Sequence, residues 1–223
     1  RRTAVEDLGS NSFRLGVYEW MPGKWWRRVD EINETVRIGE GLEESGKLGK
    51  AGIERGLRTI ELFAHARAAF DIGPDDTVTV ATSAIRDATN GPGFVARAEE
   101  EAGVRIRVLS TVEEARYGMI AAVNSTSLTD GWALDMGGGS MQLCRVEGRM
   151  AVESGSWPLG AVRMTEHFLV GTGPTPKSDI DELRSHAIAS LRADGLEADG
   201  GRMVGIGGSV RNPASLCGIV GLK

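Results

Sequence analysis

A chain of 223 residues, 26% of them charged and 41% hydrophobic, is long enough for one or two globular domains with a sizeable core. Its formal net charge of −5 at pH 7 argues against a generally basic nucleic-acid binder, and its two cysteines show no metal-binding or disulfide spacing. Because the chain has neither a signal peptide nor an apolar run long enough to span a bilayer, we expect a cytoplasmic protein without a membrane or nucleic-acid partner.

Strand and helix patterns alternate along the first half of the chain. They predict strands at 3–8, 13–19, 77–81 and 104–108, a strand and a loop within 36–41, and helices at 51–70 and 92–102. Glu6 is out of place in an otherwise apolar strand, and we expect it to face solvent at a sheet edge. The cluster from Trp25 to Arg28 fits a strand with solvated arginines better than a nucleotide contact.

A helix follows from residue 111 to about Val123. Thr111 and Glu114 fit a capping box, in which a serine or threonine and a glutamate three residues later bond each other's backbone amides, and this gives a complete structural reason for both. The polar, turn-rich segment 124–131 then suggests a hinge. We therefore expect two domains, residues 1–123 and 124–223.

The second half repeats the alternation. Its patterns predict a hairpin at 133–143, a strand at 150–154, helices at 159–170 and 179–191, and a strand at 203–206 that leads into Gly207 and Gly208. The three histidines lie on expected helices without metal-ligand spacing, so we expect them to have surface or packing roles.

The hairpin at 133–143 carries a glycine-rich turn between its strands. Asp135 precedes it, Gly137, Gly138 and Gly139 form it, and Ser140 follows. Consecutive glycines permit left-handed dihedrals, so their N–H groups can converge on one anion as in a phosphate nest, with the aspartate beside it holding a metal or a water. The alternative is a plain hairpin turn with an aspartate cap.

The turn has a counterpart near the N-terminus. When Asp7 is aligned with Asp135, four positions agree, namely Asp7/Asp135, Gly9/Gly137, Ser12/Ser140 and Leu15/Leu143. An internal repeat of this kind predicts two homologous halves, each offering one phosphate hairpin. Two such hairpins would form a cleft for a polyanion with a divalent cation.

Six motifs, taken together, indicate a family. They are 7–15, 81–88, 113–116, 135–140, 159–163 and 205–208. In this order and spacing the chain resembles the exopolyphosphatase/guanosine pentaphosphate phosphohydrolase family of the actin-like superfamily, over roughly residues 3–212. The resemblance implies an α/β protein with two actin-like (ribonuclease H-like) lobes, each a mixed sheet flanked by helices, with a cleft between them.

The resemblance also implies roles for matching residues. Asp7 and Asp135 would organise Mg²⁺ and phosphate, and Glu114 would be the catalytic carboxylate that activates the attacking water. The implied phosphate-binding residues are Ser10, Asn11, Ser12, Arg86, Gly137, Gly138, Gly139, Ser140, Gly207 and Gly208.

Two departures from the family pattern stand out. Gln142 lies where the family usually has a glutamate; its amide oxygen can ligate Mg²⁺, but without charge. The chain also ends where members usually continue, so we expect an incomplete second lobe, and a homodimer that covers its exposed surface or a marginally stable monomer. Residues 207–223 resemble the amidase signature family instead, with Ser209 matching its nucleophile, but the upstream lysine and second serine of that mechanism are not found.

These observations predict Mg²⁺-dependent hydrolysis of a terminal phosphoanhydride in inorganic polyphosphate or guanosine pentaphosphate. Two other classes stay open. One is a catalytically weak sensor of phosphate or an alarmone, and the other is a kinase or ATPase on the same fold. The sequence does not choose between the substrates.

Overall fold

In the computed structural model the chain divides into two compact units, Arg1–Leu109 and Ser110–Lys223. The structure describes residues 1–169, 171, 173–193 and 200–210, so the amidase-like end beyond residue 210 lies outside it. Within these ranges no helix is long and apolar enough to cross a membrane.

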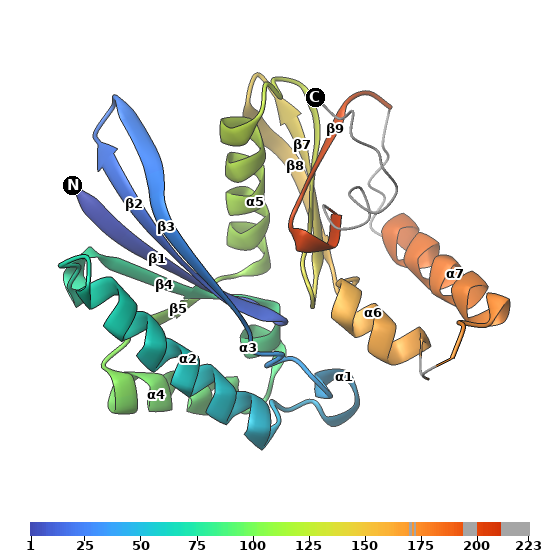
Figure 1. Cartoon of the computed structure of the whole chain (residues 1–223). Helices are drawn as coiled ribbons and strands as arrows, with labels where there is room; N and C mark the ends of the chain where they lie inside the picture. The colour runs from blue at the N-terminus through green and yellow to red at the C-terminus, as the bar shows by residue number, and fades with distance from the viewer. Residues whose placement is uncertain (170, 172, 194–199, 211–223) are drawn as a thin grey trace. The chain divides into compact units, whose positions relative to one another are not determined.

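Unit 1 is a five-stranded mixed sheet in the order β3-β2-β1-β4-β5, in which β1 to β3 are antiparallel and β1, β4 and β5 are parallel. Helices α2 and α4 cover one face of this sheet (Figure 1). Its elements are β1 (Arg2–Leu8), β2 (Ser12–Met21), β3 (Trp25–Thr35), α1 (Leu42–Ser45), α2 (Lys50–Ala68), η1 (Pro74–Asp76), β4 (Thr77–Ala81), α3 (Ser83–Asp87), α4 (Gly91–Ala102) and β5 (Ile106–Val108).

Residues 36–41, predicted as a strand and a loop, form a loop throughout. Arg37 has a φ of 49° and Gly41 a φ of 69°, and a left-handed residue near each end prevents an extended run. The backbone of this loop bonds the first hairpin, as described below. The segment from Trp25 to Arg28 does form a strand, in which Arg27 pairs with Glu19 at the surface.

Glu6, expected at a solvent edge, is fully buried. It shares a face of β1 with Ala4 and Leu8, the face that α2 covers. The Glu6 carboxylate accepts a hydrogen bond from Arg67 Nη1 of α2 and another from Thr79 Oγ1 of β4, the latter at 2.7 Å. A buried charge persists because it is paired and hydrogen-bonded, so this carboxylate ties together two strands and the helix across them.

Unit 2 is a four-stranded sheet in the order β8-β7-β6-β9, in which β6 and β9 are parallel and the other pairs antiparallel. Helix α5 packs on one face, and residues of α6 and α7 pack on the other. The elements are α5 (Thr111–Ser125), β6 (Gly131–Met136), β7 (Met141–Glu147), β8 (Met150–Trp157), α6 (Ala161–Phe168), α7 (Lys177–Ala193) and β9 (Met203–Ile206).

The boundary between the units precedes α5 rather than following it. Met119 and Ala122 of α5 belong to one apolar core with Ala133 of β6 and Cys144 of β7. The helix therefore buries its apolar side against the second sheet, and the division expected after residue 123 differs from the observed units by one helix.

We expect the Glu6–Arg67 pair to be a major contribution to the stability of unit 1. Changing Arg67→Met should lower the free energy of unfolding by about 3–5 kcal/mol, because it leaves a buried carboxylate without its cation. Urea unfolding followed by circular dichroism measures this loss, and the double variant Glu6→Leu/Arg67→Met should recover most of it.

The matched control is Arg27→Met, which breaks the surface pair with Glu19. It should cost much less stability than Arg67→Met, since exposed ion pairs contribute little. Equal losses in the Arg67 and Arg27 variants would contradict a special role for the buried pair.

Candidate active site

The two hairpins have the same backbone. The Gly9 N–H donates to the Ser12 carbonyl at 3.1 Å, and the Gly137 N–H donates to the Ser140 carbonyl at 3.0 Å. The flanking strands pair in the same register, Leu8 with Phe13 and Met136 with Met141. The internal repeat predicted from the sequence is therefore a structural repeat.

In unit 2 the carbonyls of the glycine turn all bond the start of α6. The Ala161 N–H donates to the Gly137 carbonyl at 3.0 Å, and the Val162 N–H donates to the Gly138 carbonyl at 2.9 Å. Arg163 Nε donates to the Gly139 carbonyl at 3.0 Å. No cis peptide occurs in the described residues. Because a trans peptide directs its N–H opposite to its carbonyl, the N–H groups of Gly138, Gly139 and Ser140 point away from α6.

The sequence predicts left-handed glycines in this turn, but the structure shows none at these positions. Gly137 to Gly139 are not among the described residues with positive φ. Glycine is needed instead at Gly160, the N-cap of α6, where the chain passes directly against the turn. A Cβ on Gly160 would lie 2.3 Å from the Gly139 carbonyl carbon. The direction of these amides is thus set by the carbonyl contacts with α6, and three successive N–H groups on the other side of the turn are donors suited to an anion.

The first hairpin is held in a similar way. The Ser10 carbonyl accepts from the Gly39 N–H at 3.0 Å, and the Asn11 carbonyl accepts from the Arg37 N–H at 2.8 Å. The amides of Asn11 and Ser12 accordingly point away from this loop. The Ser10 hydroxyl is buried and shares a 2.9 Å hydrogen bond with Ser83 Oγ, so it braces the hairpin against α3.

Glu114 is not a capping residue. The capping box of α5 consists of Ser110 and Glu113, because the Glu113 N–H donates to Ser110 Oγ at 3.2 Å and the Ser110 N–H donates to Glu113 Oε2 at 2.9 Å. Glu114 Oε1 instead accepts a hydrogen bond from Ser140 Oγ at 3.1 Å. The structural explanation that the sequence offered for Glu114 therefore belongs to its neighbour.

Asp135, Gln142 and Ser156 form a row across the face of the second sheet that α5 covers. They are direct partners on β6, β7 and β8, so their side chains share a face. A Cβ on Gly118 of α5 would lie 3.0 Å from Asp135 Oδ2, and one on Gly207 would lie 3.1 Å from Asp135 Oδ1. Two glycines therefore leave room for this carboxylate, and sequence reasoning assigned no role to Gly118 or Ser156.

Cys144 lies on the same face of β7 but offers no nucleophile. Burial raises the pKa of its thiol, which keeps it protonated near neutral pH. The chemistry of this face therefore falls to its carboxylates, hydroxyls and amides.

The remaining predicted residues have other local partners. Arg86 Nη1 donates to the Leu109 carbonyl at 3.1 Å and Arg86 Nε bonds Asp87 at 3.2 Å, so this side chain ties α3 to the end of β5. Asp7 is the penultimate residue of β1, lies on the face opposite to Glu6 and is exposed. Ser209, next to Gly208, donates from Oγ to the Gly137 carbonyl at 3.5 Å, which brings this loop to the glycine turn.

The donor set allows Mg²⁺ but not a metal held by protein ligands alone. In the described part of the chain, no group of three or more His, Cys, Asp or Glu side chains could hold a metal ion. Magnesium commonly takes one or two carboxylates and completes its shell with water and substrate phosphates. Asp135 is such a carboxylate beside the glycine turn of unit 2, and Asp7 is the corresponding carboxylate beside the hairpin of unit 1.

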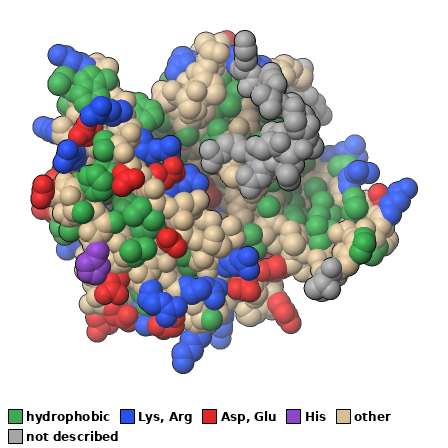
Figure 2. Space-filling model, viewed as in Figure 1, with side chains coloured by type: hydrophobic (Ala, Val, Ile, Leu, Met, Phe, Trp, Pro, Cys, Tyr) green, Lys and Arg blue, Asp and Glu red, His purple; other side chains and the backbone are tan. Residues whose placement is uncertain are grey.

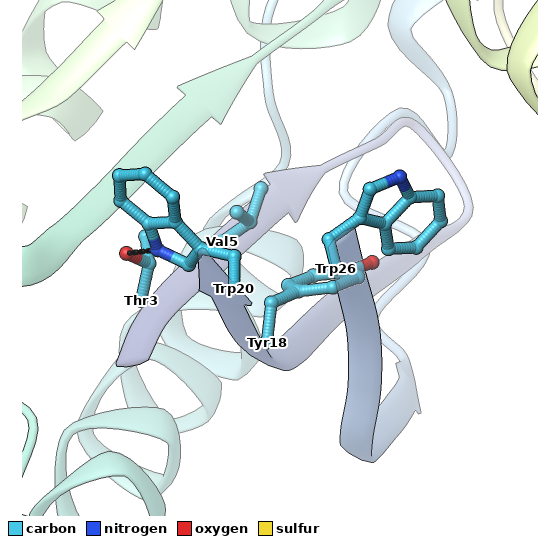
Figure 3. Close-up of a pocket in the computed structure, with 5 residues that line it drawn as sticks. All are labelled: Thr3, Val5, Tyr18, Trp20 and Trp26. Carbon is cyan, nitrogen blue, oxygen red and sulfur yellow. Dashed lines mark hydrogen bonds between the residues drawn. The ribbon is translucent and has the colours of Figure 1, made fainter. Parts of the chain in front are cut away.

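A separate hollow of about 430 Å³ lies on the face of the first sheet opposite to α2 and does not suit a polyanion. It is lined by Thr3, Val5, Tyr18, Trp20 and Trp26, none of which is charged (Figure 3). Trp20 Nε1 donates to Thr3 Oγ1 at 2.9 Å. On the visible face of the molecule, basic and acidic side chains are interspersed (Figure 2).

The crossing at Gly160 can be tested with a matched pair of glycines. Gly160 and Gly49 are both helix N-caps with φ of −69° and similar ψ, but a Cβ on Gly49 meets nothing within 4 Å. We expect Gly160→Ala to weaken binding of tripolyphosphate at least 10-fold by displacing the turn, and Gly49→Ala to leave the Kd from calorimetry unchanged. Equal affinities of both variants and the wild type would contradict this dependence of the turn on α6.

The comparisons with known proteins agree with the motifs. The model of the Ppx/GppA phosphatase family matches residues 17–209. Exopolyphosphatase 1 of Mycobacterium leprae is 33% identical over 175 residues, and that of Mycobacterium tuberculosis is 31% identical over the same length. These alignments cover 78% of this chain but only 51% and 50% of the relatives, so the chain spans about half their length.

Solved structures give the same answer for the fold. The crystal structure of an exopolyphosphatase-like protein matches 96% of this chain with a TM-score of 0.87 and 26% identity, and 68% of its own chain is covered. A Ppx/GppA family member from Aquifex aeolicus matches 100% of this chain with a TM-score of 0.76 and 26% identity, with 71% of its own chain covered. The actin-like fold expected from the sequence is confirmed, and the chain belongs to the Ppx/GppA phosphatase family.

Proposed function

We propose that this protein hydrolyses a terminal phosphoanhydride, either in inorganic polyphosphate or in the triphosphate group of guanosine pentaphosphate. The observation that carries the proposal is the bond from Ser140 Oγ to Glu114 Oε1, which places a carboxylate beside the turn that presents three amides. Relatives named exopolyphosphatase support inorganic polyphosphate as the first substrate to try.

The amides of Gly138, Gly139 and Ser140 supply positioning and charge stabilisation. A terminal phosphoryl group carries negative oxygens, and backbone N–H donors fixed before the substrate arrives lower its energy without reorganisation. Because α6 holds the opposite carbonyls, these donors cannot turn away when the site is empty of phosphate.

Glu114 is the proposed general base. Its carboxylate accepts a proton from the attacking water as the water oxygen bonds the terminal phosphorus. The bond from that phosphorus to the bridging oxygen breaks, and the shortened chain leaves with the electron pair. The products are orthophosphate and a polyphosphate with one phosphate fewer.

Mg²⁺ would supply charge neutralisation of the phosphate oxygens when bound. Asp135, with room made by Gly118 and Gly207, would hold it at the second hairpin, and Asp7 would be the matching carboxylate of the first. Gln142 as a further ligand stays a prediction.

Adjacent glutamates provide the test of the catalytic role. Glu114→Gln should lower kcat for orthophosphate release from polyphosphate by about 10²–10⁴-fold, since it removes a general base while keeping the side-chain shape. Glu113→Gln changes the neighbouring residue by the same chemistry and weakens only the helix cap, so it should retain turnover. Malachite green detection of orthophosphate measures both.

Equal turnover in these two variants would remove Glu114 from the mechanism. Tight binding of polyphosphate without orthophosphate release by the wild type would favour a sensor instead, a possibility that the uncharged Gln142 keeps open. Phosphate transfer from ATP to an acceptor would favour a kinase.

Metal dependence gives an independent prediction. Chelation with EDTA should abolish hydrolysis, and Mg²⁺ should restore it. Asp135→Asn and Asp7→Asn should each raise the Mg²⁺ concentration needed for half-maximal rate or abolish activity, because each removes one anionic ligand. Hydrolysis that survives EDTA, or Mg²⁺ titrations identical to that of the wild type, would show that these aspartates have another role.

A further inference from the structure

A chain of hydrogen bonds runs along the α5-covered face of the second sheet and ends at Glu114. Gln142 Nε2 donates to Ser156 Oγ at 3.3 Å and to Ser140 Oγ at 2.8 Å, and Ser140 Oγ donates to Glu114 Oε1 at 3.1 Å. Gln142 is 3% exposed and Ser140 is 5% exposed, so water competes little for these bonds. These hydrogen bonds thus connect the start of β7 to the first turn of α5.

The chemistry of the three groups sets the direction of every bond. A hydroxyl has one proton, an amide nitrogen has two, and an ionised carboxylate only accepts. Once the Ser140 proton is directed at Glu114, its oxygen lone pairs remain for a donor, and Gln142 Nε2 is that donor. An acceptor at position 142 would compete for the same proton, and an apolar side chain would leave the hydroxyl free to rotate.

We propose that Gln142 is a positioning residue, which holds the Ser140 hydroxyl toward Glu114 and thereby fixes the orientation of that carboxylate. Strand β7 is paired on both sides, with β6 and β8, so the amide is mounted on a rigid element. The consequence for catalysis rests on the proposed function, because an oriented carboxylate matters only if it orients the attacking water.

The kinetic test removes the donor and keeps the size of the side chain. Gln142→Met should lower kcat for polyphosphate hydrolysis by roughly 10- to 100-fold, as expected for a misplaced catalytic group, with KM changed less than about twofold. Cys144→Ala is the matched control, because Cys144 is buried on the same strand and face. It should retain the wild-type kcat.

Gln142→Glu separates positioning from metal ligation. If Gln142 positions Ser140, the added acceptor should lower kcat even at saturating Mg²⁺. A lower Mg²⁺ requirement with an undiminished kcat would overturn the proposal in favour of a metal ligand.

A double-mutant cycle tests whether the effect passes through Ser140. In a Ser140→Ala background, Gln142→Met should have no further effect on kcat, because the link to Glu114 is already cut. A full additional loss in the double variant would overturn the proposal.

A measurement without substrate keeps this inference distinct from the proposed function. The Glu114 ¹³Cδ resonance at fixed pH should move in Gln142→Met and stay in place in Cys144→Ala; an unmoved resonance in Gln142→Met would overturn the positioning role. If the resonance moves but the wild type releases no orthophosphate, the proposed function is refuted and the positioning role stands.

Discussion

The arrangement of the site depends on the planarity of the trans peptide bond. In both hairpins the segment that follows the third strand of the unit bonds the carbonyls of the turn, from residues 36–39 in unit 1 and from residues 160–163 in unit 2. Fixing a carbonyl fixes the next N–H on the opposite side. The amides that we propose to bind the anion are therefore positioned by contacts on the opposite side of the turn.

This constraint explains which small residues the site requires. Gly160 permits α6 to reach the glycine turn, and Gly118 and Gly207 leave room for the Asp135 carboxylate. These glycines are constrained by packing, whether or not they contact a substrate. A larger residue would act through the backbone, so loss of function at such positions would be a packing effect rather than evidence of a catalytic group.

Much of this organisation could be predicted from the sequence, because the repeat of Asp7 to Ser12 at Asp135 to Ser140 encodes a local structure. The errors arose where tertiary contacts decide. Glu6 is buried because a helix distant in sequence supplies Arg67. Ser110 and Thr111 are both residues that cap helices, and only the structure shows that Glu113 completes the capping box while Glu114 accepts a bond from Ser140.

The division into units was missed for a similar reason. A polar segment suggested a hinge after Val123, but polarity does not reveal which sheet the preceding helix covers. The core residues of α5 match the apolar residues of β6 and β7, and this is a property of pairs of elements rather than of a segment. The row formed by Asp135, Gln142 and Ser156 depends on strand register in the same way.

The most direct measurement is a ¹H–¹⁵N titration with tripolyphosphate and Mg²⁺ under conditions of slow turnover. The amide resonances of Gly138, Gly139 and Ser140 should shift downfield as these N–H groups donate to phosphate oxygens. The Gly148 amide, which donates to Asp130 in a turn at the other end of β7, should not shift. Saturable phosphate binding that leaves the three turn amides unmoved would contradict a phosphate site at this hairpin.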